Sequence, residues 1–475
     1  MKVNTDLLPI NYDKELLKRR SPWYWLALLL FVFSLFTRQP PLFLAALFTI
    51  LVAIVPDLWY RNALRHLVVR QYVNHRNVFF GEEVTLSVSI ENHKFLPLPW
   101  LKVENKIVPP LAVLSKKTFR LQNERRDTLA GTWLLWSFQR VTRQYRMRCQ
   151  ERGFHRFGPV RLRSSDPFGW LEGEVTAPAL ESLVVYPLIA PLEALGLSSV
   201  HPLGEHSTTR RLLEDPLQVA GVRDYVLGDD PRRIHWKATA RTGALRSKVY
   251  ETPALRRLLL LLDVWNYSEA AGGTDLEIQE LTIATAASLG IWALDEGYMV
   301  GLLANCSMIA PSAGQTLPVT RPTGESDTII TLDREEFSAG DLSPATDSVP
   351  FSSDDGQYER LLSTLGRLVP RYSGSIGTLM DTEERMFPLG TTVLLVSAAS
   401  SLDEGTIERL QDLRMRGAAV HLMLTGNPDA SENVETYDLP VHFVGGKEKW
   451  HELIRTAGNE KNGAVGTSSS ILRLG

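Results

Sequence analysis

The stretch Leu258-Leu-Leu-Leu-Leu-Asp263 is the part of the sequence that most clearly indicates a fold. An unbroken apolar run that ends at a carboxylate is typical of a strand buried on both faces of a parallel sheet. A helical stretch over about 275–295 and a further strand over about 298–306 follow it. Strand, helix and strand in this order predict a parallel sheet covered by helices.

The same rhythm returns near the C-terminus. The chain there predicts strands over 391–397 and 418–424 and helices over about 402–416 and 447–457. We therefore expect an α/β domain over 255–457. A segment rich in Ser, Pro, Gly, Asp and Thr interrupts it over about 307–356 and is predicted to be a mobile insertion, and 458–475 is predicted to be a flexible tail.

Two uncharged apolar runs lie at the other end of the chain, one on each side of Arg38. They predict a membrane anchor over 1–70 with two transmembrane helices, about 21–37 and 41–57. At about 1.5 Å per residue each run covers roughly 26 Å, and flanking Arg, Trp and Tyr side chains suit the edges of a bilayer core of ~30 Å. A cleaved signal peptide and a buried soluble hairpin are the alternatives.

Basic residues lie on the outer sides of this helical hairpin, while the connector carries only Arg38. The positive-inside rule therefore places both ends of the hairpin in the cytoplasm. We expect a multi-pass protein of the inner (cytoplasmic) cell membrane, with both termini and the large C-terminal part cytoplasmic. The flanking basic residues are Lys14, Lys18, Arg19, Arg20, Arg61, Arg65 and Arg70.

The region after the anchor is rich in strand patterns. Val84, Leu86, Val88 and Ile90 alternate with polar residues, as in a half-buried strand. Further strand-like runs follow, separated by Pro, Asn and Gly residues, with little helical periodicity. A β-sandwich over 72–188 is the predicted structure.

Composition limits the possible functions. The 475 residues are 44% hydrophobic and carry a formal net charge of −3, which fits neither a disordered chain nor a basic nucleic-acid-binding protein. No nucleic-acid partner is expected. The two cysteines, Cys149 and Cys306, lie far apart and outside any metal-binding pattern, so we expect no disulfide framework and no cysteine-ligated zinc site. No cofactor is expected.

Between the two predicted domains lies a segment over 205–254 that is dense in Arg, Asp and aromatic residues. Its centre, residues 222–251, reads VRDYVLGDDPRRIHWKATARTGALRSKVYE. Gly228 suits a turn, Trp236 suits an apolar anchor into a core, and the charged residues suit a complementary partner. An ion-paired brace between two domains is the alternative. The predicted interaction residues are Arg223, Tyr225, Gly228, Asp229, Arg232, Trp236, Lys237 and Arg241.

The order Arg-x-Tyr-x-x-Gly-Asp-Asp-x-Arg-x-Ile-x-Trp-Lys-x-x-Ala-Arg-x-Gly-x-Leu, from Arg223 to Leu245, resembles the signature of the domain-of-unknown-function 58 (DUF58) family. The resemblance implies a multi-domain layout: a transmembrane helical hairpin, a β-rich region and an α/β von Willebrand A-like (Rossmann-type) domain. It also implies association with MoxR-type AAA+ ATPases, in chaperone-like or complex-assembling roles.

A von Willebrand A-type domain holds a divalent ion through an Asp-x-Ser-x-Ser loop after its first strand. Here that loop begins at Asp263, and Trp265 and Tyr267 replace the two serines. Asn266 and Ser268 remain as oxygen donors in an altered register. We expect no functional metal site, and we expect Asp263 to cap the strand end or to organise the loop.

No P-loop, HExxH or GxSxG motif occurs, so the chain is predicted not to be an enzyme. The expected function is that of a membrane-anchored adaptor or scaffold that acts with a MoxR-type AAA+ ATPase on an unknown client. The alternatives are a self-associating envelope component, and an anion- or lipid-headgroup-binding protein or hydrolase that uses a basic strip. That strip consists of Arg210, Arg211, Arg232, Arg233, Lys237, Arg241, Arg246 and Lys248.

Overall fold

The computed structural model describes residues 2–12, 21–37, 39–108, 111–114, 128–166, 168–169, 171–197, 219–226, 229–250, 256–264, 267–268, 273–309, 342–343, 347–372, 375–383, 386–388, 390–427 and 439–463. The chain divides into two compact units. The first contains Met1–Tyr186, and the second contains Pro187–Ala310 and Glu336–Gly475. Both helices and sheets occur, so the multi-domain, mixed character predicted from the sequence is confirmed.

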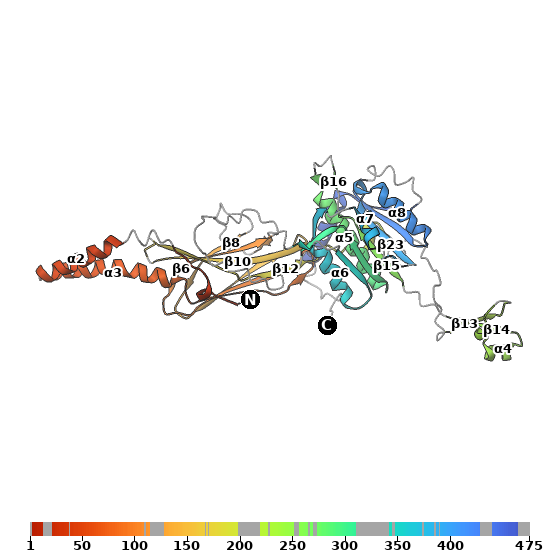
Figure 1. Ribbon diagram of the computed structural model, residues 1–475, viewed down its shortest axis with the longest axis horizontal. Helices are drawn as coiled ribbons and strands as arrows, with labels where there is room; N and C mark the ends of the chain where they lie inside the picture. Colours follow the sequence, from red (N-terminus) through yellow and green to blue (C-terminus); the bar gives the residue numbers. More distant parts are fainter. Residues whose placement is uncertain are drawn as a thin grey trace. The chain divides into compact units, whose positions relative to one another are not determined.

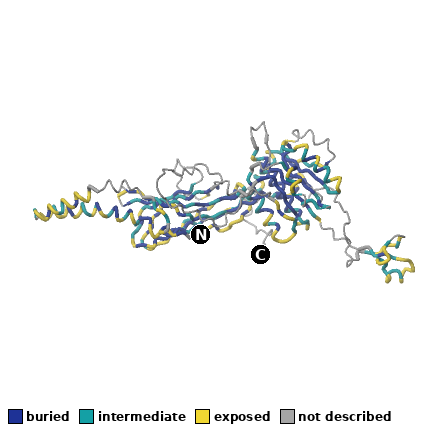
Figure 2. Tube along the Cα trace, viewed as in Figure 1, coloured by how far each residue is buried: buried dark blue, intermediate teal, exposed yellow. Residues whose placement is uncertain are grey.

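Two apolar helices, α2 (Ser21–Thr37) and α3 (Pro40–Ala63), belong to the first unit. Most of their large apolar side chains are exposed, and both helices carry little of the buried colour in Figure 2. By length and composition, α3 could cross a membrane, whereas α2 is apolar but shorter. The Tyr24 hydroxyl of α2 donates to the Asp57 carboxylate of α3.

Helix α3 is longer than the predicted span of 41–57. The helix extends beyond residue 57 because its last residues pack on the strands of the first unit. Tyr60 is 1% exposed and donates from its hydroxyl to the Glu172 carbonyl at 2.8 Å. Ala63 and Leu64 belong to that unit's hydrophobic core. The end of α3 is therefore part of the folded unit that follows it.

The strands of the first unit form two sheets (Figure 1). The five-stranded sheet has the order β1 (Lys2–Asn4), β3 (Leu67–Val73), β5 (Glu83–Asn92), β9 (Arg140–Arg148) and β7 (Ala112–Val113). The seven-stranded sheet has the path β2 (Asn11–Tyr12), β11 (Glu172–Ala177), β10 (Gly153–Ser165), β12 (Glu181–Val185) and β4 (Asn77–Val78), with β6 (Leu98–Val108) between β10 and β8 (Thr128–Leu135).

One hydrophobic core joins the two sheets. Leu86 and Met147 of the five-stranded sheet share it with Phe157, Leu162 and Leu183 of the seven-stranded sheet. The alternation read from the sequence is present in β5, where the apolar residues are buried and the intervening side chains are less so. Both sheets therefore use one face to build the core.

The second unit is built on a six-stranded sheet with the order β21-β18-β15-β23-β24-β25. Five strands are parallel, and β21 (Asp347–Ser352) pairs antiparallel with β18 at the edge. The parallel strands are β15 (Arg257–Leu262), β18 (Met299–Ala304), β23 (Thr391–Ala398), β24 (Ala419–Thr425) and β25 (Val441–Gly445). Smaller strands are β16 (Tyr267–Ser268), β17 (Gly273–Thr274), β19 (Cys306–Ile309), β20 (Leu342–Ser343) and β22 (Leu368–Tyr372).

Helices cover both faces of this sheet. Leu259 and Leu261 of β15 share a core with residues of α7 (Ile376–Thr382) and α8 (Glu404–Met415). Leu260 instead approaches Gly290 of α5 (Leu276–Asp295) on the other face. Helix α5 also contacts α6 (Gly356–Arg367) and α9 (Lys447–Gly463). The five leucines of β15 are fully buried because alternate side chains meet helices on opposite faces.

Parts of the predicted insertion, about 307–356, and of the predicted tail, 458–475, are regular secondary structure. Strands β19, β20 and β21 and the start of α6 lie within 306–356, and α9 continues to Gly463. Short edge strands bury few side chains and so carry a weak apolar pattern, which explains why β21 was missed. The rest of the predicted insertion, 310–341, and the end of the predicted tail lie outside the described residues.

Candidate functional site

The segment with the densest sequence signal folds as a small element of its own. Strands β13 (Val219–Asp224) and β14 (Arg246–Tyr250) pair antiparallel. Between them lie the short helices η3 (Pro231–Arg233) and α4 (Trp236–Thr242), and Figure 1 labels β13, β14 and α4. We call residues 219–226 and 229–250 the signature module. Three residues of the predicted sites, Gly228, Arg210 and Arg211, lie outside the described residues.

Three predicted residues meet at the start of the signature module. Arg223 Nη2 lies 2.6 Å from Asp229 Oδ1, and the other carboxylate oxygen accepts from the Val226 amide at 3.2 Å. The Tyr225 hydroxyl donates to the Asp229 carbonyl at 2.9 Å. The hydrogen bond from Arg223 lowers the pKa of Asp229, so this carboxylate is ionised at neutral pH. Arg223, Tyr225 and Asp229 therefore act together to close the turn.

Two residues outside the predicted interaction set shape helix α4. His235 accepts a hydrogen bond at Nδ1 from the Ala238 amide at 3.1 Å, which caps the N-terminus of α4. Gly243, with φ +71°, ends the helix in the left-handed region that favours glycine. The glycine could have been recognised as a C-cap from its place after the helical residues. From the sequence, His235 is expected only to be a satisfied or surface histidine, and no pattern marks it as a cap.

Trp236 corrects the sequence prediction. It was expected to anchor into a core, but its side chain is 69% exposed. Helix α4 has no buried residue, because a seven-residue helix on a two-stranded ribbon is too small to enclose an indole. Arg232, Lys237 and Arg241 are exposed as well. These four residues form what we call the signature surface.

The signature module has a positive charge excess. Its described residues include seven basic and three acidic side chains. The carboxylates of Asp224 and Asp229 are engaged by Arg246 at 2.7 Å and by Arg223, and Asp230 accepts from the Arg232 amide. The cations of the signature surface therefore face solvent with little internal compensation.

A second polar cluster surrounds Asp263 at the carboxyl end of β15. This side chain is 5% exposed. Its Oδ1 accepts from Asn305 Nδ2 at 2.6 Å, and its Oδ2 accepts from the hydroxyls of Ser397 and Ser401 at 3.0 and 3.2 Å. Asn305 Oδ1 in turn accepts from the Val264 amide at 2.8 Å. The cluster links the loops that follow β15, β18 and β23.

The Asp263 carboxylate is engaged by hydrogen-bonding neighbours. Asn305 offers an amide NH₂, and the hydroxyls of Ser397 and Ser401 lie within hydrogen-bond distance, whereas Mg²⁺ requires several oxygen ligands directed at it in octahedral geometry. Among the residues that the structure describes, no three His, Cys, Asp or Glu side chains gather in a way that could hold a metal ion. Trp265 and Asn266 lie outside that set. Asp263 organises the strand ends through hydrogen bonds.

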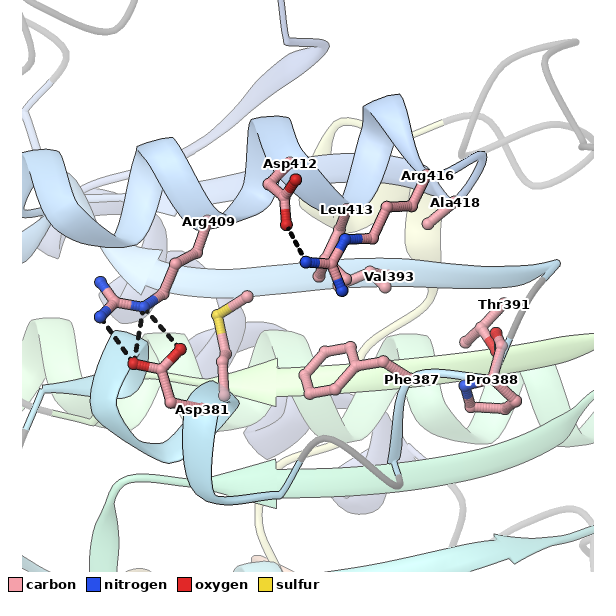
Figure 3. Close-up of a pocket in the computed structure, with 11 residues that line it drawn as sticks. Asp381, Phe387, Pro388, Thr391, Val393, Arg409, Asp412, Leu413, Arg416 and Ala418 are labelled. Carbon is pink, nitrogen blue, oxygen red and sulfur yellow. Dashed lines mark hydrogen bonds and ion pairs between the residues drawn. The ribbon is translucent and has the colours of Figure 1, made fainter.

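A pocket of about 330 Å³ lies between α7, α8 and the start of β23 (Figure 3). Its charged side chains are paired across it or along α8: Arg409 holds Asp381 in a two-pronged ion pair, and Arg416 holds Asp412 at 2.7 Å. The hydrogen bonds from Arg409 lower the pKa of Asp381. Apart from Thr391, the remaining lining residues are apolar.

Together, the β-rich first unit, the mixed α/β second unit and a helix long and apolar enough to cross a membrane define a multi-domain protein. Residues 221–321 match the family model described as "Protein of unknown function DUF58". This range includes the signature module from Gly221 on, Asp263 and Asn305, and it confirms the resemblance inferred from the sequence over that part of the chain.

A Bacillus subtilis (strain 168) protein described as "Uncharacterized protein YeaD" is 24% identical over 210 residues, which are 42% of this chain. The chain spans about half of that relative, since the match covers 48% of it. Among solved structures, the CARDB domain of a Pyrococcus furiosus protein is 10% identical with a TM-score of 0.16, over 25% of this chain and 91% of that one. A Listeria innocua β-glucosidase is 12% identical with a TM-score of 0.14, over 25% and 16%. Structural similarity at this level supports no functional conclusion.

Proposed function

We propose that this protein is a membrane-anchored, non-catalytic adaptor whose signature surface docks onto a partner protein. The observation that carries the proposal is the 69% exposed Trp236 flanked by Arg232, Lys237 and Arg241. Trp and Arg are the residues most enriched among interface hot spots. Two ion pairs of the same module, Arg223 with Asp229 and Arg246 with Asp224, preorganise its backbone, so little order has to be gained on binding.

The partner that fits is a protein with an acidic rim around an apolar pocket, since the pocket would bury the indole and the rim would complement the cations. The family resemblance points to a MoxR-type AAA+ ATPase as that partner, acting on a client that is not identified. The adaptor would then bring ATPase and client together at the membrane.

The anchor and the finer fold complete this proposal. We infer that α2 and α3 cross the inner membrane as a hairpin, with both termini and the second unit in the cytoplasm. The two sheets sharing one core support a β-sandwich for the first unit. The parallel strands with helices on both faces support a von Willebrand A-like domain for the second.

Affinity capture of the full chain from native membranes, after crosslinking in mild detergent, tests the docking surface. We expect Trp236→Ala to reduce recovery of an AAA+ ATPase by at least about 30-fold, the effect of losing ~2 kcal/mol at a hot spot. Met415→Ala is the matched control, because Met415 is an 81% exposed apolar residue on α8 of the same unit. Equal recovery from both variants would overturn the proposal.

The same preparation tests the alternative of an anion- or lipid-binding protein. If no ATPase is captured and anionic lipid is retained in a way that Arg241→Ala abolishes, the basic residues serve lipid or anion binding instead. Strong salt dependence of that retention would support this alternative, because exposed charge interactions are screened.

A further inference from the structure

Three large aromatic side chains are exposed at one end of the first unit. Phe95 is 83% exposed, Trp136 is 61% exposed and Phe138 is 69% exposed. Phe95 lies in the connection between β5 and β6, and the other two lie in the turn between β8 and β9. Exposed aromatics gathered in this way mark an interaction surface.

Hydrogen bonds join the two turns to each other. The Phe138 amide donates to the Lys94 carbonyl at 3.3 Å, and the Ser137 hydroxyl donates to the Phe95 carbonyl. Asn92 Nδ2 donates to the Trp136 carbonyl at 3.0 Å. We call Phe95, Trp136 and Phe138 the aromatic rim.

The aromatic rim lies beside the end of α3. The Lys94 ammonium group donates to the carbonyls of Ala63 and Arg65, the latter at 2.6 Å. The His93 amide donates to the His66 carbonyl at 2.9 Å. These bonds hold the β5–β6 connection against the last turn of the helix. The rim is therefore attached to the point where α3 enters the folded unit.

Phe138 is held there at a conformational cost. Its φ is +57°, in the left-handed region that side chains other than Gly, Asn and Asp rarely occupy. The turn closes through the Gln139 amide, which donates to the Trp136 carbonyl at 3.3 Å, and Gln139 Oε1, which accepts from the Trp136 amide. A glycine would fit this position without strain. An exposed phenylalanine kept in such a position indicates a role for its side chain.

We propose that the aromatic rim inserts into the lipid interface beside α3. This inference rests on the proposed membrane insertion of that helix. From Asp57 to Ala63 the helix rises about 9 Å, whereas the interfacial layer of a bilayer is about 5–8 Å thick on each side. If Asp57 marks the edge of the hydrocarbon core, Ala63 lies at the outer side of the interfacial layer. A Trp or Phe side chain at that level can reach the headgroup region, where aromatic rings are favoured.

The charges near the rim suit an anionic lipid surface. Arg61 and Arg65 are exposed at the same helix end. Nearby carboxylates already have partners: Asp6 accepts a hydrogen bond from the His66 amide at 2.6 Å, and Glu91 is paired with Arg70 at 2.9 Å. Cationic side chains at the surface of a cytoplasmic leaflet are attracted to its anionic lipids. The rim would fix the orientation of the first unit against the bilayer.

Site-specific fluorescence on the full chain in vesicles of phosphatidylcholine and phosphatidylglycerol tests this contact. An environment-sensitive fluorophore is attached to the thiol introduced by Phe138→Cys. The two native cysteines are kept, because they are buried. Tyr72→Cys on β3 is the control, because Tyr72 is 62% exposed and lies about 17 Å along the strand from Leu67. Phe48→Cys, at a 68% exposed position of α3, reports insertion of the helix.

We expect the label at position 138 to be blue-shifted and quenched at least twofold by lipids with a nitroxide near the headgroup. The label at position 72 should stay unquenched, and the label at position 48 should be quenched by lipids with a deep nitroxide. If position 48 is quenched while 138 behaves like 72, the rim proposal is wrong and helix insertion stands.

Two further outcomes also overturn the rim proposal. If position 48 is not quenched, helix insertion fails, and the rim proposal fails with it. A blue shift at 138 that depends on protein concentration and not on quencher lipid would assign the rim to contacts between copies of the chain.

Discussion

At Phe138, an exposed aromatic side chain is combined with a strained backbone conformation, so the residue costs stability. Replacement of Phe138 by Gly should relieve the left-handed strain of ~1–2 kcal/mol, less the ~0.5–1 kcal/mol that glycine loses through chain entropy. We expect a net gain of about 0.5–1 kcal/mol, and the first unit's melting midpoint, followed by differential scanning fluorimetry in detergent, should rise by about 1–4 °C.

Phe95→Gly is the control for this prediction. Among the described residues other than glycine, only His66 and Phe138 have positive φ, so Phe95 carries no strain of this kind. Its replacement should leave the midpoint unchanged or lower it. A fall of similar size in both variants would show that the φ of Phe138 stores no strain.

At the scale of the elements, Lys94 links helix α3 to the strands that follow. Its ammonium group is buried and donates to carbonyls at the helix end, which otherwise lack partners within the helix. Lys94→Met should cost about 1–3 kcal/mol because it leaves these carbonyls without that donor. The measurement is the first unit's melting midpoint, with Lys106→Met of β6 as the control.

This loss should depend on pH. Burial lowers the pKa of Lys94 to about 7, below the ordinary value of 10.5. At pH values between about 7 and 10.5, the Lys94 amine is protonated in the unfolded chain and neutral in the folded chain. The free energy of unfolding therefore rises with pH across this window. The gap in melting midpoint between wild type and Lys94→Met should therefore widen as pH rises from about 7. A constant gap would contradict the pKa assignment.

At the scale of the whole molecule, the two units have separate hydrophobic cores, so a core change in one should leave the other intact. Asp263→Ala removes the acceptor of three hydrogen bonds and should cost about 3 kcal/mol, lowering the second unit's transition by about 6–12 °C. The first unit's transition should not move. Asp412→Ala, at an exposed ion pair, should change little.

The same melting experiment distinguishes a structural role of Asp263 from metal binding. The carboxylate is already satisfied by Asn305 and two serine hydroxyls, so added Mg²⁺ or a chelator should leave the second unit's midpoint unchanged. A chelator-sensitive midpoint that Asp263→Ala abolishes would show that a cation is bound there.

Much of the fold was predictable because its signals are local. Strand β15 is an unbroken apolar run because helices cover both of its faces, and α3 stands out because nearly all of its first residues are apolar. In the signature module, Arg223, Tyr225 and Asp229 were recognised together because they lie within one turn of chain. Strand β21 was missed since a short edge strand buries too little to leave a pattern.

The sequence by itself determined the apolar helix, most strands of the parallel sheet with three of the helices that cover it, and the segment rich in Arg and Asp. Only the tertiary structure decided which groups meet at Asp263, whose partners Asn305 and Ser401 are 42 and 138 residues away. It also decided that Trp236 is exposed and that the aromatic rim lies at the end of α3. Contacts across such separations depend on how strands are ordered within the sheets, and exposure depends on what packs nearby. Neither property leaves a pattern in neighbouring residues, because both arise from the packing of segments that are distant in the chain.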